Sequence, residues 1–532
     1  MAQLDLATLH EAIAATVPDR ECLVWRGRRW TWREMAERTR RLAGVLHAHG
    51  LGRPGRSGDP WESPHDHLAL YLHNGPEYLE GMVGAHKARV APFNVNYRYV
   101  DDELAYLFAD GRPAAVIYHS RFAASLGRVL DRLERTPLLL QVADESGAAL
   151  LPGALDYEAA LAAASAGPLP GVRPEAGDLH ILYTGGTTGM PKGVLWRIGD
   201  LMNGPLGLPR TGLAEAVAAA AGRTSQRVLV APPLMHGAGT WSALGAWIGG
   251  ATVVLPDVVG RFDAAGALTT AVRERVTRMP VVGDAFARPI ADELEARPYD
   301  LGALRQIVNS GAAINPAVRR RLTSLLPHTR VIDVLGSSET GFQVTRRGAE
   351  DRPFAPAAGA HVLSADRTRH LRPGEDEPGW LAKSGPIPLG YLNDPDKTAA
   401  TFIVLGGVRM VVAGDRARLL PDGTIQVLGR ESTTINTGGE KVFAEEVEAV
   451  VRAVPGVTDA LVIGRPSERW GHEIVAVLVL SAELTDEQLR EACAVHLARY
   501  KLPKAYFRTG RALRLPNGKA DYAAARAIAE AS

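Results

Sequence analysis

The stretch TGGTTGMPKG, residues 184–193, decides how the rest of the chain is interpreted. It directly follows an apolar run, residues 179–183, with the length and composition of a buried strand. Glycines let backbone N–H groups approach an anion, hydroxyls add hydrogen-bond donors, and Lys192 supplies positive charge. The stretch is not a Walker A loop, because Lys192 is followed by Gly193 rather than serine or threonine. It predicts a polyphosphate site at a strand end, with an ordinary glycine-rich turn as the alternative.

Apolar runs alternate with helical stretches on both sides of this motif. Such alternation is typical of parallel sheets covered by helices. Ligands of these sheets lie beyond the carboxyl ends of the strands, so we expect the site there. A helix is predicted over 32–49, and strands are predicted over 67–72, 90–93, 114–118, 228–231, 251–255, 306–309 and 331–335.

The pattern changes in the last third of the chain. Residues 350–429 are rich in glycine and proline and predict a small β subdomain. A compact α+β pattern follows, with helices expected over 444–454 and 486–500 and strands over 459–464 and 474–480. The predicted class is α/β, with a large N-terminal domain of two helix-covered sheets (1–429) and a small, mobile α+β C-terminal domain (430–532).

Composition excludes several other classes of protein. The chain has 532 residues and a formal net charge of +1, and no basic stripe that would indicate nucleic-acid binding. No run approaches the ~20 apolar residues of a membrane span. Cys22 and Cys493 are the only cysteines, which fits a reducing cytoplasm, and no secretory signal pattern opens the sequence. The oligomeric state stays open, with a homodimer as one alternative.

Further motifs occur in a fixed order after the phosphate stretch. They are VLGSSETG (334–341), AGD (413–415), GR (429–430), NTGGEK (436–441) and PNGK (516–519). In this order they resemble the ANL superfamily of adenylate-forming enzymes, which comprises acyl-CoA synthetases, adenylation domains of peptide synthetases and firefly-type luciferases. The resemblance covers nearly the whole chain. It is most similar to bacterial fatty-acyl and steroid-side-chain CoA synthetases.

The resemblance implies a two-step ligase that uses ATP, Mg²⁺ and CoA. A carboxylic acid attacks ATP to give acyl-AMP and pyrophosphate, and the CoA sulfur then displaces AMP. One alternative is a stand-alone adenylating enzyme of secondary metabolism that does not use CoA, and that passes the acyl group to a carrier or amine or activates nitrite for diazotisation. A non-catalytic scaffold is a third interpretation, and the intact residues Lys192, Glu339, Asp415 and Lys519 argue against it.

Catalytic roles follow from matching motif positions. Lys519 matches the position of the family's catalytic lysine. An ammonium that bridges two reacting anions lowers the barrier to their reaction. Glu339 is expected to contact Mg²⁺, because a carboxylate beside a triphosphate needs a cation between them. The resemblance gives Ser338 and Thr184 phosphate contacts, and the family's C-terminal domain rotates after adenylation to remove the lysine.

The resemblance also implies binding residues. Asp415 matches a ribose-binding aspartate, and Arg430 is expected to contact ribose or phosphate beside the hinge. The predicted nucleotide contacts are Thr184, Gly185, Gly186, Thr187, Thr188, Gly189, Lys192, Ser310, Gly311, Ala312, Asp333, Leu335, Gly336, Ser337, Ser338, Asp415, Arg430 and Lys519. The predicted acyl pocket comprises His236, Gly237, Thr240, Trp241 and Gly311, and the CoA channel comprises Gly438, Gly439 and Lys441.

Three positions depart from the family pattern. Leu335 stands where an aromatic residue usually stacks on adenine, and Asn436 stands where a basic residue is frequent. Thr433 occupies the position of the hinge acid, three residues after Arg430. These departures leave adenylation in place and put the second step in question. His236 also has a purely structural interpretation.

Overall fold

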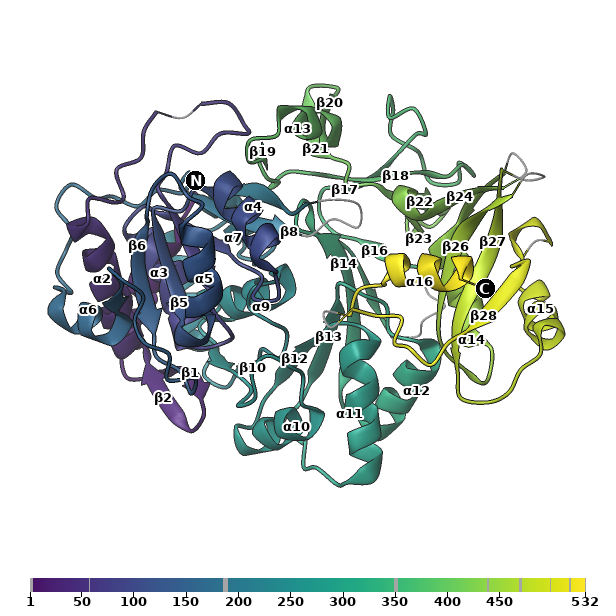
Figure 1. Cartoon of the computed structure of the whole chain (residues 1–532), viewed down its shortest axis with the longest axis horizontal. Coiled ribbons are helices and arrows are strands. Elements are labelled where there is room, and N and C mark those ends of the chain that lie inside the picture. The colour runs from purple at the N-terminus through teal and green to yellow at the C-terminus, as the bar shows by residue number, and fades with distance from the viewer. Residues whose placement is uncertain are drawn as a thin grey trace.

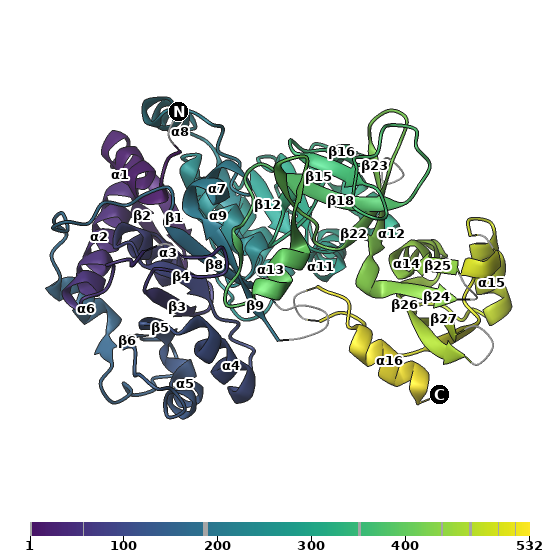
Figure 2. The same ribbon diagram turned by 90° about the horizontal axis from the view of Figure 1, so that it is seen from above.

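The computed structural model describes residues 3–56, 58–184, 190–348, 353–437, 440–467, 471–497, 499–515 and 518–531. About the first four-fifths of the chain forms one large body, and the C-terminal residues form a smaller body beside it (Figure 1). Figure 2 shows the smaller body next to the end of the larger one that carries α11 (Asp284–Ala296) and α12 (Pro316–Leu325).

The phosphate stretch lies at one end of an eight-stranded sheet. The inner strands of this sheet are parallel. The strand that precedes the stretch in sequence, β8, pairs antiparallel with β9, the strand that follows it. In spatial order the strands are β19 (Gly390–Tyr391), β9 (Lys192–Arg197), β8 (Leu179–Thr184), β4 (Ala91–Asn94), β3 (His67–Tyr71), β5 (Ala115–His119), β6 (Leu138–Val142) and β7 (Leu155–Asp156).

A second sheet of nine strands follows the same rule, with a parallel centre and antiparallel edges. In spatial order its strands are β16 (Ala355–Pro356), β15 (Gly341–Arg347), β14 (Arg330–Ser337), β13 (Gln306–Ser310), β12 (Arg278–Val281), β10 (Arg227–Leu229), β11 (Thr252–Val254), β1 (Glu21–Trp25) and β2 (Arg28–Thr31). The expectation of two helix-covered sheets is confirmed.

One apolar core joins the two sheets. Leu70 and Leu182 of the first sheet and Val228 of the second are buried in the same cluster as residues of several helices. These include α1 (Leu6–Thr16), α2 (Trp32–Ala48), α3 (Pro76–Lys87) and α9 (Gly237–Ile248). The start of α2 is fixed by a capping box, in which Thr31 and Glu34 exchange hydrogen bonds.

The outer faces of the sheets have helical covers of their own. The eight-stranded sheet packs on α4 (Asp101–Gly111) and α5 (Ala123–Leu130). The nine-stranded sheet packs on α10 (Ala264–Arg273), α11 (Asp284–Ala296) and α12 (Pro316–Leu325). The remaining helices are α6 (Tyr157–Ala163), α7 (Ile198–Asn203), α8 (Leu213–Gly222) and α13 (Pro395–Thr401).

A six-stranded sheet follows, formed largely by residues of the expected β subdomain. Its strands run β20 (Phe402–Leu405), β21 (Val408–Val411), β18 (Gly379–Ser384), β22 (Asp415–Leu419) and β23 (Ile425–Arg430), with β17 (Ala360–Leu363) paired to β18. The chain then passes through a short 3-10 turn, Glu431–Thr433, into the smaller body. The exact domain boundary stays a prediction.

The smaller body has a five-stranded sheet and three helices. The strands are β25 (Glu440–Phe443), β24 (Thr434–Thr437), β27 (Gly471–Leu480), β26 (Val457–Ser467) and β28 (Ala505–Arg508), and the helices are α14 (Ala444–Ala453), α15 (Asp486–Ala494) and α16 (Tyr522–Glu530). The helix expected over 486–500 was too long. α15 ends at Ala494, and a 3-10 turn follows over Arg499–Lys501, after which Leu502 packs into the same core as Leu497.

Among the helices that the structure describes, none is long and apolar enough to cross a membrane.

Two buried histidines give the large body an acid-sensitive core. His86 of α3 and His180 of β8 stack with ring centroids 5.6 Å apart, and their Nε2 and Nδ1 atoms lie 3.3 Å apart. Burial lowers the pKa of His86 to about 4 and that of His180 to about 3. Both rings are therefore neutral in the folded chain near neutral pH.

The stability of the chain should fall as the pH drops from about 6.5 to about 4, because the unfolded histidines bind protons that the folded ones do not. Each histidine contributes a slope of about 1.4 kcal/mol per pH unit in that window. The free energy of unfolding, obtained from urea denaturation at several pH values in this window, measures this slope. His180→Gln should flatten it, and His328→Gln, at an exposed position, should not. Equal slopes in both variants would contradict the assignment.

Candidate active site

Strand ends from both sheets supply the first site residues. Thr184 closes β8 and lies opposite Lys192, the first residue of β9. Gly185, Gly186, Thr187, Thr188 and Gly189 lie outside the described residues, so their predicted phosphate contacts stay predictions. The two ends of the phosphate stretch are thus held together by the β8–β9 pair.

Lys192 forms an ion pair with Asp394, an acid that sequence reasoning missed. Asp394 also caps α13 by accepting a hydrogen bond from the N–H of Lys397 at 2.9 Å. Burial alone would raise the pKa of Asp394, but these two partners lower it, so its carboxylate is charged. The Lys192 side chain is 41% exposed, so its ammonium is held without being enclosed. Asp394 followed by Pro395 is a helix-start pattern that could have revealed it.

Glu339 follows β14 in a tight turn. The N–H of Ser337 donates to the Thr340 hydroxyl at 2.9 Å, and the N–H of Glu339 donates to the Ser337 hydroxyl at 3.3 Å. The Trp196 indole fixes the same turn by donating to the carbonyl of Ser338 at 2.8 Å. These bonds leave the backbone little freedom, so the turn is preorganised.

The Glu339 carboxylate has a partner from a distant part of the chain. The hydroxyl of Tyr391, in β19, donates to Glu339 Oε1 at 3.0 Å. Burial and the negative charge of Glu339 raise the pKa of Tyr391, so this phenol stays protonated and remains a donor. Sequence reasoning missed Tyr391, because β19 joins the sheet only in the folded chain.

Asp415 and Arg430 face each other across β22 and β23. The pair is in direct register, and Arg430 Nε donates to Asp415 Oδ1 at 3.2 Å. Asp415 is only 6% exposed. The charge of Asp415 raises the pKa of Arg430 despite its partial burial, and Glu339 adds to the effect. The two predicted ribose-site residues therefore lie together, near Glu339.

Lys519 reaches this group from the smaller body. The loop before α16 extends from that body toward β13 and α11 (Figures 1 and 2). Its base is anchored by Arg514, which forms two hydrogen bonds of 2.9 Å with Asp459. Gly518 has φ +82°, and a Cβ there would lie 3.0 Å from the carbonyl oxygen of Val282. The loop thus touches the large body at a point where only glycine fits.

The pKa shifts of Lys519 and His236 indicate which charged groups lie near the Lys519 ammonium. Burial lowers the pKa of Lys519, the positive charge of Arg430 lowers it further, and Glu339 opposes this shift. Burial, followed by the charge of Lys519, lowers the pKa of His236 to about 3. Glu339, Arg430 and His236 are therefore the charged or titratable neighbours of the Lys519 ammonium.

Asp333 is bound to the protein on both carboxylate oxygens. Arg319 bonds to Oδ1, and Arg346 donates to Oδ2 at 2.8 Å. Asn309 also donates to Oδ1 at 3.0 Å and to the carbonyl of Ala312 at 2.9 Å. This network holds the ends of β13 and β14 together, next to Ser310, Gly311, Leu335 and Gly336. The geometry gives Asp333 a positioning role, and direct nucleotide contact stays a prediction.

The predicted acyl pocket has an aromatic wall. The ring of Trp241 lies edge-on to Trp196 and to Phe342, each with centroids 6.4 Å apart. A Cβ on Gly237 would lie 3.3 Å from Leu182 and 3.6 Å from Trp241. Thr240 is buried and bonds to the carbonyl of Leu234, which gives it a structural role. Phe342, 36% exposed, was not predicted from sequence.

The CoA-channel residues are not tested by this geometry. Gly438 and Gly439 lie outside the described residues, as does the side chain of Lys441.

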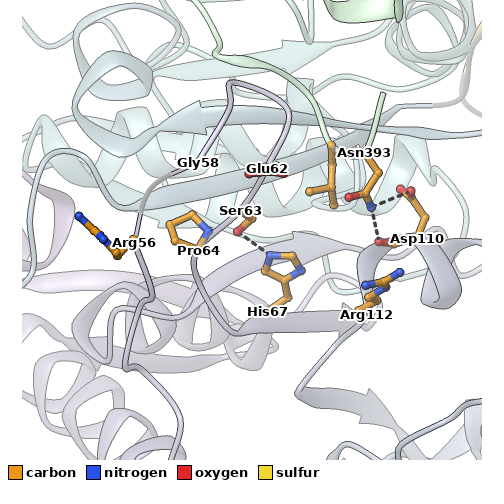
Figure 3. Close-up of a pocket in the computed structure, with 10 residues that line it drawn as sticks. Arg56, Gly58, Glu62, Ser63, Pro64, His67, Asp110, Arg112 and Asn393 are labelled. Atoms are coloured by element: carbon orange, nitrogen blue, oxygen red, sulfur yellow. Dashed lines mark hydrogen bonds between the residues drawn. The ribbon is translucent and has the colours of Figure 1, made fainter. Parts of the chain in front are cut away.

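A separate polar pocket of about 250 Å³ contains none of the predicted site residues. It is lined by Arg56, Gly58, Glu62, Ser63, Pro64, His67, Asp110, Arg112, Leu392 and Asn393. Figure 3 shows His67 bonded to Ser63, and Asn393 bonded to Asp110, across its floor. Asp110 also accepts a 2.6 Å hydrogen bond from the hydroxyl of Tyr183. This bond connects the lining of the pocket to β8.

Two family models match this chain. The family model of the AMP-binding enzymes matches residues 10–391, and that of their C-terminal domain matches residues 446–519. The chain is 47% identical to the medium-chain acyl-CoA ligase Mig of Mycobacterium avium, over 97% of this chain and 96% of that protein. It is 34% identical to the 3-oxocholest-4-en-26-oate–CoA ligase of Rhodococcus rhodochrous, over 98% and 95% of the two chains.

Solved structures share the fold at lower identity. The anthranilate CoA ligase AuaEII, in complex with anthranoyl-AMP, has a TM-score of 0.83 at 21% identity and covers 100% of this chain and 99% of its own. ATP-bound MatB from Rhodopseudomonas palustris has a TM-score of 0.81 at 23% identity, covering 98% and 99%. Fold and site together define an AMP-forming, adenylate-forming ligase. The chain belongs to the AMP-binding enzyme family.

Gly518→Ala should lower the rate of acid-dependent ATP–pyrophosphate exchange by about tenfold, because φ +82° and the nearby Val282 carbonyl cost a side chain roughly 1–2 kcal/mol. Gly510→Ala is the control, since a Cβ there meets nothing within 4 Å. Thermal melting should change little in either variant. Exchange that is unaffected by Gly518→Ala would mean that the loop does not dock here during adenylation.

Proposed function

We propose that this chain converts a medium-chain carboxylic acid into its CoA thioester through an acyl-AMP intermediate. The observation that carries the proposal is the position of Lys519, a cation from the smaller body that lies close to Glu339 and Arg430 of the larger one. Such a cation stabilises charge that builds on phosphoryl oxygens when two anions react. The CoA ligases among the relatives support CoA as the acceptor, and they do not favour a CoA-independent enzyme.

In the proposed adenylation step, each residue of the chain has its own task. Thr184 and Lys192 hold the ends of the phosphate stretch around the triphosphate. Asp415 accepts hydrogen bonds from the ribose hydroxyls, with Arg430 fixing its orientation. Lys519 lies between the attacking carboxylate and the α-phosphate. The C-terminal domain then turns about residues 431–433 and withdraws Lys519, so that CoA can enter.

The residues present fit a magnesium ion bound through ATP. Mg²⁺ takes one or two carboxylates together with phosphate oxygens and water. Glu339 provides a carboxylate, of which one oxygen, Oε1, accepts the hydrogen bond of the Tyr391 hydroxyl. Among the described residues no cluster of three or more metal-ligating side chains is present, so the phosphates would provide most ligands. When bound, the ion would neutralise phosphate charge beside Glu339.

An apolar acid fits the wall that Trp241, Trp196 and Phe342 form. The relative named as a medium-chain acyl-CoA ligase supports an alkyl chain of moderate length. Two buried free thiols, Cys22 and Cys493, support a reducing cytoplasm as the place of action. Whether the chain acts as a homodimer stays a prediction.

Lys519→Ala should lower the rate of acid-dependent ATP–pyrophosphate exchange by on the order of 10²–10³-fold, as loss of one charge-stabilising donor does. Lys504→Ala, at an exposed position in the same body, should leave it unchanged. Near-normal exchange by the Lys519 variant would refute its catalytic role.

Phe342→Ala should shift the preference of the enzyme toward longer acids. Removing this half-exposed ring opens the wall beside Trp241, and each newly buried methylene is worth about 0.8 kcal/mol. The ratio of kcat/KM for dodecanoate to that for octanoate should therefore rise severalfold. Val404→Ala, an exposed position in β20, is the control. An unchanged ratio would place the acyl chain elsewhere.

A further inference from the structure

One buried asparagine connects two parts of the active site. Asn94 is the last residue of β4, the neighbour of β8 in the eight-stranded sheet, and it is 7% exposed. The N–H of Tyr183 donates to Asn94 Oδ1 at 2.8 Å, and Asn94 Nδ2 donates to the carbonyl of Tyr183 at 2.9 Å. The same nitrogen donates to the carbonyl of Met235 at 2.7 Å. One amide thus bonds two segments that lie far apart in sequence.

The bonds to Tyr183 take the place of backbone pairing at the point where the strands end. β4 and β8 run parallel, with Phe93 opposite Ile181. Beyond that pair, the carboxamide of Asn94 bonds both the N–H and the carbonyl of Tyr183, because it offers the same donor and acceptor as a peptide group. Since Tyr183 is followed by Thr184, Asn94 holds the chain where it enters the phosphate stretch.

The second segment, residues 232–235, leads into the predicted acyl pocket. It ends directly before His236, whose pKa is lowered by burial and then by the charge of Lys519. The Thr240 hydroxyl, in α9, bonds to the carbonyl of Leu234. The segment is therefore fixed both by α9 and by the eight-stranded sheet.

Asn74, which follows β3, holds the same segment in the same way. Its Nδ2 donates to the carbonyl of Pro232 at 3.1 Å, and its Oδ1 accepts from the N–H of Leu234 at 2.7 Å. Within the described part of the chain, no side-chain hydrogen bond joins Asn74 to β8. The two asparagines therefore differ in one respect: Asn94 also bonds the strand that enters the phosphate stretch.

We propose that Asn94 is a positioning residue that fixes the phosphate stretch relative to the acyl pocket, so that one side chain aligns ATP with the acid. Holding two reactants in near-attack geometry accelerates their reaction, and a displacement of about 1 Å removes much of that gain. The inference rests on the proposed adenylation step. It gives Asn94 an effect on the binding of both substrates, whereas Asn74 affects the acid alone.

Steady-state kinetics of octanoate-dependent ATP–pyrophosphate exchange separate the two asparagines. Asn94→Leu removes the donors and the acceptor at similar volume, and it should raise KM for ATP and KM for octanoate about tenfold each. Asn74→Leu is the matched control, which should raise KM for octanoate severalfold and leave KM for ATP within about twofold. Thermal melting checks that each variant folds. Equal effects of the two variants on KM for ATP would overturn the inference.

Asn94→Asp provides a second test, which stays available if the leucine variant does not fold. A charged carboxylate has no donor and would face two carbonyl oxygens, whereas the protonated acid has one O–H to donate. The exchange rate of this variant, divided by that of the original enzyme at the same pH, should therefore rise at least about threefold between about pH 8 and about pH 6. A ratio that stays constant over this range would contradict the proposed role.

Calorimetry with magnesium and α,β-methylene-ATP, in the absence of acid, tests the role without catalysis. Asn94→Leu should weaken binding of this analogue about tenfold, and Asn74→Leu should weaken it less than about twofold. Unchanged affinity in the Asn94 variant would overturn the inference. An original enzyme that binds the analogue but exchanges pyrophosphate with no acid would instead refute the proposed function, and the affinities of the two variants would still decide the role of Asn94.

Discussion

The site depends on bringing a lysine ammonium from one body close to an arginine of the other. Lys519 and Arg430 carry like charges, and the pKa of each responds to the neighbouring charged groups. Glu339 and Asp415 offset this repulsion, and a bound triphosphate would add further negative charge. The arrangement therefore depends on both bodies together, and many hydrogen bonds of the structure serve to position a few charged atoms.

Those positioning bonds come from parts of the chain far apart in sequence. Tyr391 holds Glu339, Asp394 holds Lys192, and Trp196 holds the Ser338 carbonyl. Each partner lies in a different element from the residue it holds. Preorganised groups need not reorient as charge develops, so such bonds contribute to catalysis without touching the substrate.

The small body is fixed at both ends of its contact with the large one. At one end, Gly518 packs against Val282, and at the other, Glu445 bonds to Arg430 and Thr433. Two further hydrogen bonds lie between them, from Arg288 to the Thr458 carbonyl and from Asn315 to the Arg452 carbonyl. These polar contacts can be exchanged for water at modest free-energy cost, which is compatible with the proposed turning of this domain between two steps.

The sequence by itself determined the class of fold and the main charged residues. Strand–helix alternation and the glycine-rich stretch after residues 179–183 predicted the fold class, and the family resemblance carried by the order of the later motifs predicted Glu339, Asp415, Arg430 and Lys519 as site residues. Only the tertiary structure revealed Tyr391, Asp394, Phe342 and Glu445, and it tied up Asp333 with two arginines. Each of these roles depends on a partner from another element, and no local pattern specifies which side chain will stand opposite once the sheets and the two bodies have packed.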